Sequence, residues 1–122
     1  MSDPRPSNRR CGEVLEALEG VIASRKADPS ARSYTTKLLA SGPPGAGAKV
    51  TEEAAELVRA ACEETADRVV AEAADLVYHA LVLLACRDLT LARVEDELAR
   101  RFGVSGLDEK AARSAVGGGG SS

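Results

Sequence analysis

Residues 69–86 read VVAEAADLVYHALVLLAC, and this stretch decides the fold class. Apart from two acids and the pair Tyr78-His79, nearly every position is apolar. In a helix these apolar side chains would point in every direction around the axis, so the helix would have to be covered on all sides. Glu72 and Asp75 lie inside the stretch, and a buried carboxylate is strongly destabilising unless it is paired or bound to a cation. The stretch therefore predicts a central helix that carries a charged site.

Two further helices are expected before this central one, from apolar residues at helical spacing. The first carries an apolar stripe that begins at Val14 and fades before Pro29, because proline disfavours helix in the residue that precedes it. The second spans about residues 48–64. Residues 42–47, GPPGAG, lie between the two helices and are expected to form a loop.

The central helix and one that follows it complete the predicted set. Thr65 or Asp67 is the expected N-cap of the central helix. Thr90 is the expected N-cap of the last helix, which carries an apolar stripe and ends at Gly103. No segment alternates as a strand would, and we see no internal repeat. The fold class is therefore all-α, a helical bundle of four main helices per chain.

Length sets the domain organisation and raises the question of assembly. The 122 residues allow one domain, which we expect over residues 11–116, with a flexible lead at 1–10 and a flexible Gly/Ser tail at 117–122. Two or three short helices of one chain would struggle to cover the central helix, so we expect a homodimer or a higher homo-oligomer. The alternative is a compact monomer with this helix at its centre.

Composition excludes some partners and compartments. The net charge of −3 gives no general attraction for nucleic acid or anionic lipid, so a polyanionic substrate would need a metal ion or a local basic cluster. Three cysteines in no metal-ligand pattern, together with an N-terminus that has no apolar signal region, fit a cytoplasmic protein with reduced thiols. The polar residues within 69–86 argue against a membrane span.

Acidic residues on two of the expected helices form a candidate metal site. Glu53 and Glu56 flank the apolar face of the helix at 48–64, one turn apart, whereas Glu52 faces away from the core. Glu72 and Asp75 have the same spacing on the central helix. Two such pairs on adjacent helices would place four carboxylates around one point, and hard oxygen ligands suit Mg²⁺ or Mn²⁺.

Ordinary roles remain open for the same residues. An acidic helix face is most often just solvated, which weighs most against the group at 52–56. His79 shares a stripe with Glu72 and Asp75, and such a histidine is more often hydrogen-bonded in the core than a ligand or a catalytic group. Tyr78 is expected to pack. The carboxylates inside the apolar central helix are therefore the stronger signal.

The order of these motifs resembles one family. Residues 49–56, KVTEEAAE, followed by 72–79, EAADLVYH, are similar to the signature of the phosphoribosyl-ATP pyrophosphohydrolases, which belong to the MazG-like all-α nucleoside triphosphate pyrophosphohydrolases. The family's lysine-bearing stretch before the first acidic motif is replaced here by PPGAG. The resemblance covers about residues 13–113, because further segments are similar in the same order: 18–22, 24–28, 33–38 and 105–110.

The resemblance implies a reaction and a role for each site residue. The reaction is Mg²⁺-dependent hydrolysis of phosphoribosyl-ATP to phosphoribosyl-AMP and pyrophosphate, the second step of histidine biosynthesis. The four acids named above would be the metal ligands, and Glu52 would bind a second ion or orient the attacking water. The substrate-binding candidates are Arg25, Lys26, Tyr34, Thr35, Lys37, Lys49 and Lys110, with His79 and Arg113 as further candidates.

Two other classes of function compete with this interpretation. A house-cleaning pyrophosphohydrolase acting on dUTP, dCTP or other nucleoside triphosphates would use the same acids with a different base pocket. A non-enzymatic helical dimerisation module would have no need for carboxylates inside the central helix.

Overall fold

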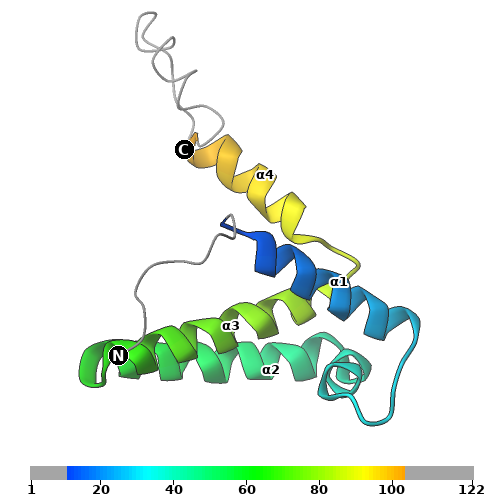
Figure 1. The fold of residues 1–122 in the computed structure, drawn as a ribbon, viewed down its shortest axis with the longest axis horizontal. Helices are drawn as coiled ribbons and strands as arrows, with labels where there is room; N and C mark the ends of the chain where they lie inside the picture. Colours follow the sequence, from blue (N-terminus) through cyan, green and yellow to red (C-terminus); the bar gives the residue numbers. More distant parts are fainter. Residues whose placement is uncertain (1–10, 104–122) are drawn as a thin grey trace, which may run out of the picture. The chain divides into compact units, whose positions relative to one another are not determined.

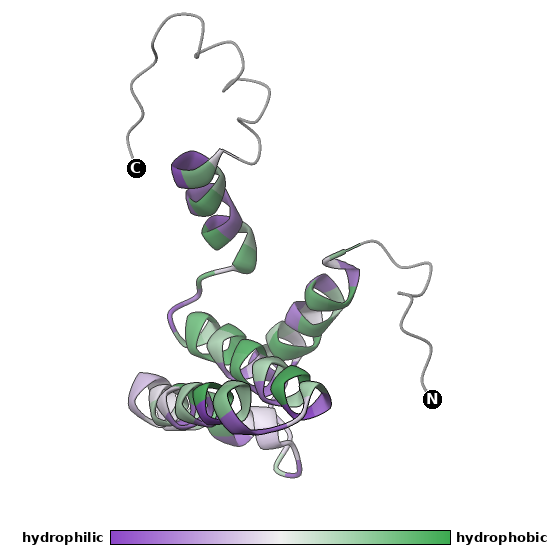
Figure 2. Ribbon diagram, turned by 90° about the vertical axis from the view of Figure 1, so that its left-hand side faces the viewer, coloured by the Kyte–Doolittle hydropathy of each residue, from purple (hydrophilic) through white to green (hydrophobic). Residues whose placement is uncertain are grey.

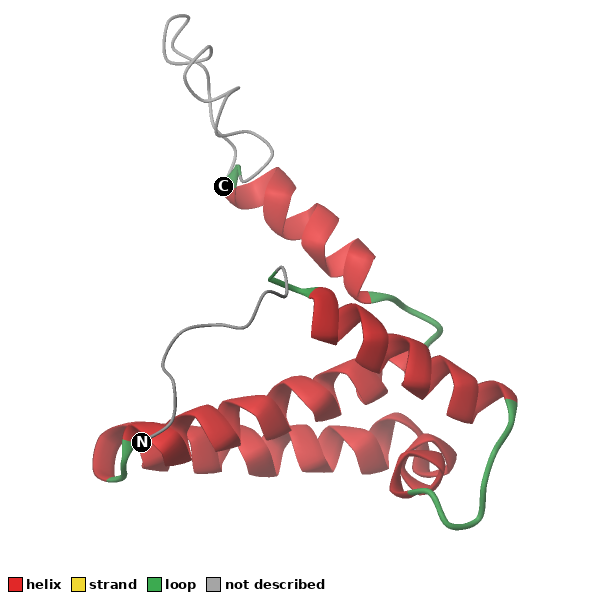
Figure 3. Ribbon diagram, in the orientation of Figure 1, coloured by secondary structure: helices red, strands yellow, loops and turns green. Residues whose placement is uncertain are grey.

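The computed structural model describes residues 11–103, and this part of the chain contains no strand. Its helices are α1 (Glu13–Ala27), α2 (Tyr34–Glu63), α3 (Ala66–Cys86) and α4 (Leu91–Phe102) (Figure 1). Helices account for nearly all of the described chain, with short connections between them (Figure 3). The all-α prediction with four main helices is therefore confirmed. The expected lead at 1–10 and the Gly/Ser tail at 117–122 lie outside the described residues.

α2 and α3 form an antiparallel pair that lies side by side over most of its length (Figure 1). The turn between them is short because both helix ends are capped within it. The Glu64 N–H donates to the Ala60 carbonyl at 2.8 Å, and the Thr65 hydroxyl accepts from the Arg68 N–H at 3.3 Å. Thr65 is thus the N-cap of α3, one of the two residues predicted for that position. α1 makes far fewer contacts with either helix.

The prediction of a loop at residues 42–47 is wrong, because this segment is helical except at Gly42. Gly42 has φ 69° and ψ −173°, which breaks α2 into a short first part and a long second part. Pro43 and Pro44 open the second part, where a residue needs no N–H donor and a φ near −65° already suits a helix. Gly45 lies so close to Ser41 across the break that a Cβ there would overlap the serine side chain.

The core of the first three helices is small. Its buried apolar residues are contributed by α1, α2 and α3, namely Ile22, Leu38, Ala46, Ala60, Leu81 and Val82. Large apolar side chains remain exposed on the α2 and α3 surfaces, at Val58, Val70 and Val77. The apolar character of α3 extends along the helix (Figure 2). Within the described first unit, α1 and α2 therefore leave part of the apolar surface of α3 uncovered.

α3 is also long and apolar enough to cross a membrane, by length and composition alone. The core helix of a soluble protein meets the same criterion. Two polar side chains within α3, those of Glu72 and His79, are buried by the protein itself. These buried polar groups are typical of an inner helix of a bundle.

α4 belongs to a second compact unit and is described by itself. The Thr90 hydroxyl accepts from the Arg93 N–H at 3.4 Å, and Gly103 ends the helix with φ 74°. Both predicted ends of this helix are confirmed. Its apolar stripe is present, but Leu98 and Phe102 are exposed within the chain.

Candidate metal centre

Three carboxylates from two helices converge at one point. Glu53 and Glu56 come from the long part of α2, and Glu72 comes from α3. Each offers one oxygen, and these oxygens all lie within 4.8 Å of one another. The spacing of one helical turn in α2 sets two acids on the same face, and the antiparallel packing of α3 brings the third against them. We call these three residues the acidic cluster.

Two of the three residues of the acidic cluster are buried, and Glu56 is half-buried. Glu53 is 7% exposed and Glu72 is 5% exposed. In each of them the Oε1 atom is buried and has no hydrogen-bond partner among the residues that the structure describes. Two unit charges 4.8 Å apart repel by about 3.5 kcal/mol at the effective dielectric constant of about 20 that suits such sites. Hard oxygen donors with unpartnered lone pairs fit Mg²⁺ or Mn²⁺.

Asp75, the fourth predicted ligand, is not brought into the acidic cluster. Its side chain is exposed, and it does not belong to the group of converging oxygens. Glu56 has the equivalent position on α2, three residues after a buried glutamate, and does reach the cluster. The aspartate side chain is one methylene shorter, so its carboxylate extends less far from the helix axis.

Two basic residues contact the acidic cluster from its edges. Lys49 donates to Glu52 Oε1 at 3.2 Å and lies 3.9 Å from Glu53 Oε2. The hydrogen bond to Glu52 raises the pKa of Lys49, with nearby acids adding to the effect and desolvation opposing it. Lys49 is therefore a stable cation beside Glu53. Glu52 itself is exposed.

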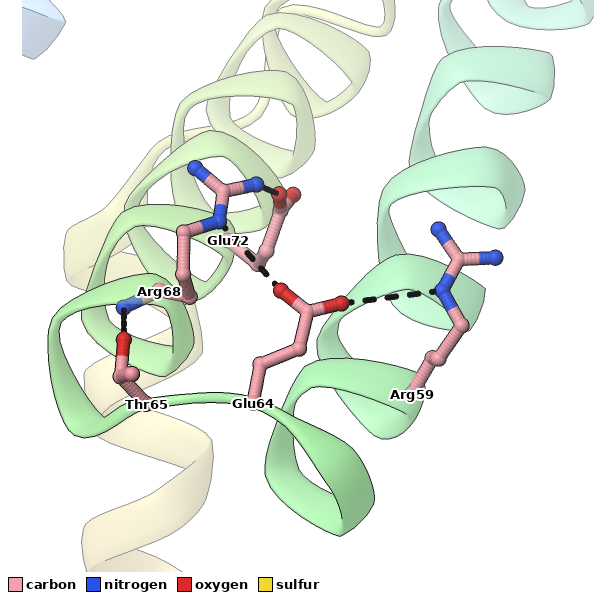
Figure 4. A network of polar contacts seen from close by, with 5 residues as sticks. All are labelled: Arg59, Glu64, Thr65, Arg68 and Glu72. Atoms are coloured by element: carbon pink, nitrogen blue, oxygen red, sulfur yellow. Dashed lines mark hydrogen bonds and ion pairs between the residues drawn. The ribbon is translucent and has the colours of Figure 1, made fainter.

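Arg68 is the second basic residue, and the sequence interpretation missed it. Its guanidinium donates to Glu72 Oε2 and also to Glu64 Oε1 at 3.4 Å (Figure 4). Glu64 in turn lies 3.9 Å from Arg59, so a chain of alternating charges spans the turn between α2 and α3. Arg68 could have been found from the sequence, because it lies four residues before Glu72 and residues at this spacing are neighbours on one face of a helix.

His79 is a hydrogen-bonded core residue. It is 5% exposed, and its Nδ1 lies 2.8 Å from the carbonyl oxygen of Asp75 in the preceding turn. A carbonyl can only accept, so Nδ1 carries the proton. Nε2 then accepts from the Tyr34 hydroxyl at 3.0 Å. Thr35 and Tyr78 form a second hydroxyl pair close by, so the start of α2 is tied to α3 by side-chain hydrogen bonds.

The other predicted substrate-binding residues are spread over the first unit. Lys26 donates to the Ala85 carbonyl at 2.5 Å and pairs with Asp88 at 2.6 Å, which ties the end of α1 to the end of α3. Arg25 and Lys37 are exposed and form no ion pair within the described part of the chain. Lys110 and Arg113 lie outside the described residues.

The fold and the acidic cluster together define an all-α protein with a carboxylate site suited to a divalent cation. The model of the family described as phosphoribosyl-ATP pyrophosphohydrolase matches residues 15–102, and the chain belongs to this family.

Individual relatives carry the name phosphoribosyl-ATP pyrophosphatase. One from Rhodospirillum rubrum is 52% identical over 101 residues, which cover 83% of this chain and 86% of the relative. One from Pelobacter propionicus is 50% identical over 101 residues, covering 83% and 94% of the two chains. One from Paracoccus denitrificans is 45% identical over 113 residues, covering 93% and 99%. The match therefore extends over nearly the full length of these relatives.

Proposed function

We propose that this chain hydrolyses phosphoribosyl-ATP to phosphoribosyl-AMP and pyrophosphate, the second step of histidine biosynthesis, with Mg²⁺ as its cofactor. Family membership and the shared name of the relatives support the reaction. The observation that best supports a metal site is that the Oε1 atoms of Glu53 and Glu72 are buried and have no partner among the described residues. A buried carboxylate oxygen without a partner is strongly unfavourable unless a cation satisfies it.

The proposed ligands are Glu53, Glu56, Glu72 and Asp75, with Mn²⁺ as an alternative ion. The first three already converge, whereas Asp75 is exposed and its inclusion follows the family pattern. A bound Mg²⁺ would neutralise charge on the triphosphate and make its phosphorus easier to attack. The carboxylates of this chain would hold the ion.

Glu52 is the proposed catalytic carboxylate. It is exposed and sits next to Glu53, and its proposed role is to orient the attacking water or to bind a second ion. Lys49 holds Glu52 by a hydrogen bond and keeps a positive charge beside the acids. This arrangement supports a role for Lys49 in receiving phosphate oxygens at the mouth of the site.

Further contacts are proposed for the negatively charged and hydroxyl groups of the substrate. Arg25 and Lys37 are exposed cations without an ion pair among the described residues, so they can bind phosphate without first breaking a contact. Binding by Lys26 would require its pair with Asp88 to open. The remaining candidates are Tyr34 and Thr35, whose hydroxyls already have partners, and Lys110, Arg113 and His79.

The proposal includes a homodimer or a higher homo-oligomer, located in the cytoplasm. Val58, on α2, and Val70 and Val77, on α3, are exposed on the surface of one chain. A second copy packed on this surface would remove these apolar side chains from water.

A magnesium-dependent assay of pyrophosphate release tests the function directly. The purified chain would be offered phosphoribosyl-ATP, ATP, dUTP and dCTP at matched concentrations, with and without Mg²⁺. We expect rapid release from phosphoribosyl-ATP alone, and none after chelation. Equal rates on dUTP or dCTP would favour the hypothesis of a house-cleaning pyrophosphohydrolase. No release from any nucleotide would favour the hypothesis of a non-enzymatic dimerisation module.

A further inference from the structure

α2 and α3 carry the same short pattern where they meet. Residues 49–56 read KVTEEAAE and residues 68–75 read RVVAEAAD. In both octets a buried glutamate is preceded by a basic residue four positions earlier and by a valine three positions earlier. Two alanines and then an acid follow the glutamate. We found no internal repeat from the sequence alone, and this short one is recognisable only once the two helices are seen side by side, because each octet then supplies one half of the same site.

The two buried glutamates are arranged alike by their basic residues. Arg68 bonds Glu72 through Oε2, and Lys49 lies nearest to Glu53 through Oε2. In both glutamates it is the other oxygen, Oε1, that is buried without a partner. Each carboxylate thus has one oxygen next to a resident cation of its own helix and one oxygen unused.

Arg68 differs from Lys49 in the firmness of its contact and in its exposure. Its side chain is 54% exposed and that of Lys49 is 32% exposed, whereas that of Glu72 is only 7% exposed. The guanidinium therefore sits at the boundary between solvent and the acidic cluster, reaching Glu72 from one side and Glu64 from the other (Figure 4). A guanidinium presents a planar fork of N–H donors that matches phosphate oxygens as well as it matches a carboxylate.

We propose that Arg68 is a phosphate-binding residue that is held on Glu72 while the site contains no cation and turns to the substrate once a divalent cation occupies it. This inference rests on the proposed metal site. Three clustered carboxylates attract Arg68 strongly, and a bound divalent cation cancels most of that attraction. The guanidinium at the rim then gains more from a phosphate oxygen than from a carboxylate that already ligates a metal ion.

Calorimetric titration without substrate tests the first half of the exchange. We would measure the dissociation constant of Mg²⁺ for the parent chain, Arg68→Met, Arg68→Lys and Arg59→Met. Arg59 is the matched control, because it belongs to the same charge network but, among the described residues, pairs with Glu64 and with no member of the acidic cluster. Arg68→Met should bind Mg²⁺ about threefold to tenfold more tightly, since a competing cation has been removed. Arg59→Met and Arg68→Lys should stay close to the parent.

Titration with inorganic pyrophosphate at saturating Mg²⁺ tests the second half. Arg68→Met should bind pyrophosphate roughly tenfold to a hundredfold more weakly, the loss expected for one charge-assisted hydrogen bond, with Arg59→Met unchanged. Arg68→Lys should fall between them, because a lysine keeps the charge but loses the fork.

Opposite results separate the inference from the proposed function. Unchanged pyrophosphate binding by Arg68→Met would overturn the phosphate role, and weaker Mg²⁺ binding with unaltered helicity would show that Arg68 orients Glu72 rather than competing with the ion. A parent chain that binds no Mg²⁺ would instead remove the metal site itself, and the inference with it.

Discussion

α2 and α3 bring related octets to one site, yet the two halves of that site are not equal. On α2 the pair of acids one turn apart, Glu53 and Glu56, enters the acidic cluster, whereas on α3 only Glu72 of the corresponding pair does and Asp75 stays exposed. Lys49 and Arg68 each contact two carboxylates, but Lys49 hydrogen-bonds the exposed Glu52 and lies 3.9 Å from the buried Glu53, whereas Arg68 hydrogen-bonds the buried Glu72 directly. The difference teaches that a repeated pattern sets which residues can meet, and that side-chain length and competing partners decide which ones do.

The largest expected effect comes from neutralising the matched acids Glu56 and Asp75. Glu56→Gln and Asp75→Asn should each abolish measurable Mg²⁺-dependent turnover, because the proposed site needs both as ligands. Without substrate, Glu56→Gln should weaken Mg²⁺ binding more than Asp75→Asn, since only Glu56 already lies in the acidic cluster.

Both variants should keep the helical fold in metal-free buffer, and Glu56→Gln should be slightly more stable, because one repulsion within the cluster is gone. Calorimetry, circular dichroism and an assay of pyrophosphate release provide the three measurements. Turnover by Asp75→Asn within a few-fold of the parent would exclude Asp75 from the site.

A second prediction concerns the outer surfaces of the two helices. Val70, on α3, is 68% exposed in one chain, and Val70→Glu should convert the proposed dimer to monomers because it places a charge within an apolar interface. Val14→Glu on α1 is the matched control and should leave the assembly intact. Light scattering measures the mass of both variants. A monomeric parent chain would contradict the dimer.

A third prediction concerns the bond between the first part of α2 and α3. Tyr34→Phe removes the donor to the buried Nε2 of His79 and should destabilise the fold by about 1–2 kcal/mol, the usual effect of leaving a buried acceptor unpaired. The urea midpoint reports the change. Tyr78→Phe is the comparison, and it should lose less, because the Thr35 and Tyr78 hydroxyls are less deeply buried than His79. Equal losses would argue that Tyr34 acts through packing alone.

The smallest expected effect is on the protonation of Lys49. Glu52→Gln should lower the pKa of Lys49 toward its ordinary value of 10.5, because the hydrogen bond to Glu52 is the main cause of its raised pKa. The stabilisation from this pair is complete below pH 10.5 and is lost as pH rises through the raised pKa, so the parent should hold the contact to higher pH than the variant. An NMR titration that follows the Cε resonance of Lys49 measures this pKa in both proteins. An unshifted Lys49 in Glu52→Gln would point to Glu53 as its main partner.

The sequence by itself was enough for the all-α class, for the ends of α3 and α4, and for the family. Thr65, Thr90 and Gly103 act as predicted because a cap depends on residues within a turn or two of it. The acids at 53, 56 and 72 could likewise be picked out as candidate ligands. One helical turn separates the two acids on α2, and a carboxylate stands out in an otherwise apolar helix.

Only the tertiary structure decided which charges meet. The segment at 42–47 became helical because its prolines occupy the first turn after Gly42, a choice that the turn-rich composition concealed. Leu81, which faces outward on a helical wheel of α3, is buried within the chain. The meeting of Glu72 with Glu53 and Glu56, without Asp75, follows from the rotation and axial register of α2 against α3. These quantities are set by packing between residues distant in sequence, and no local pattern encodes them.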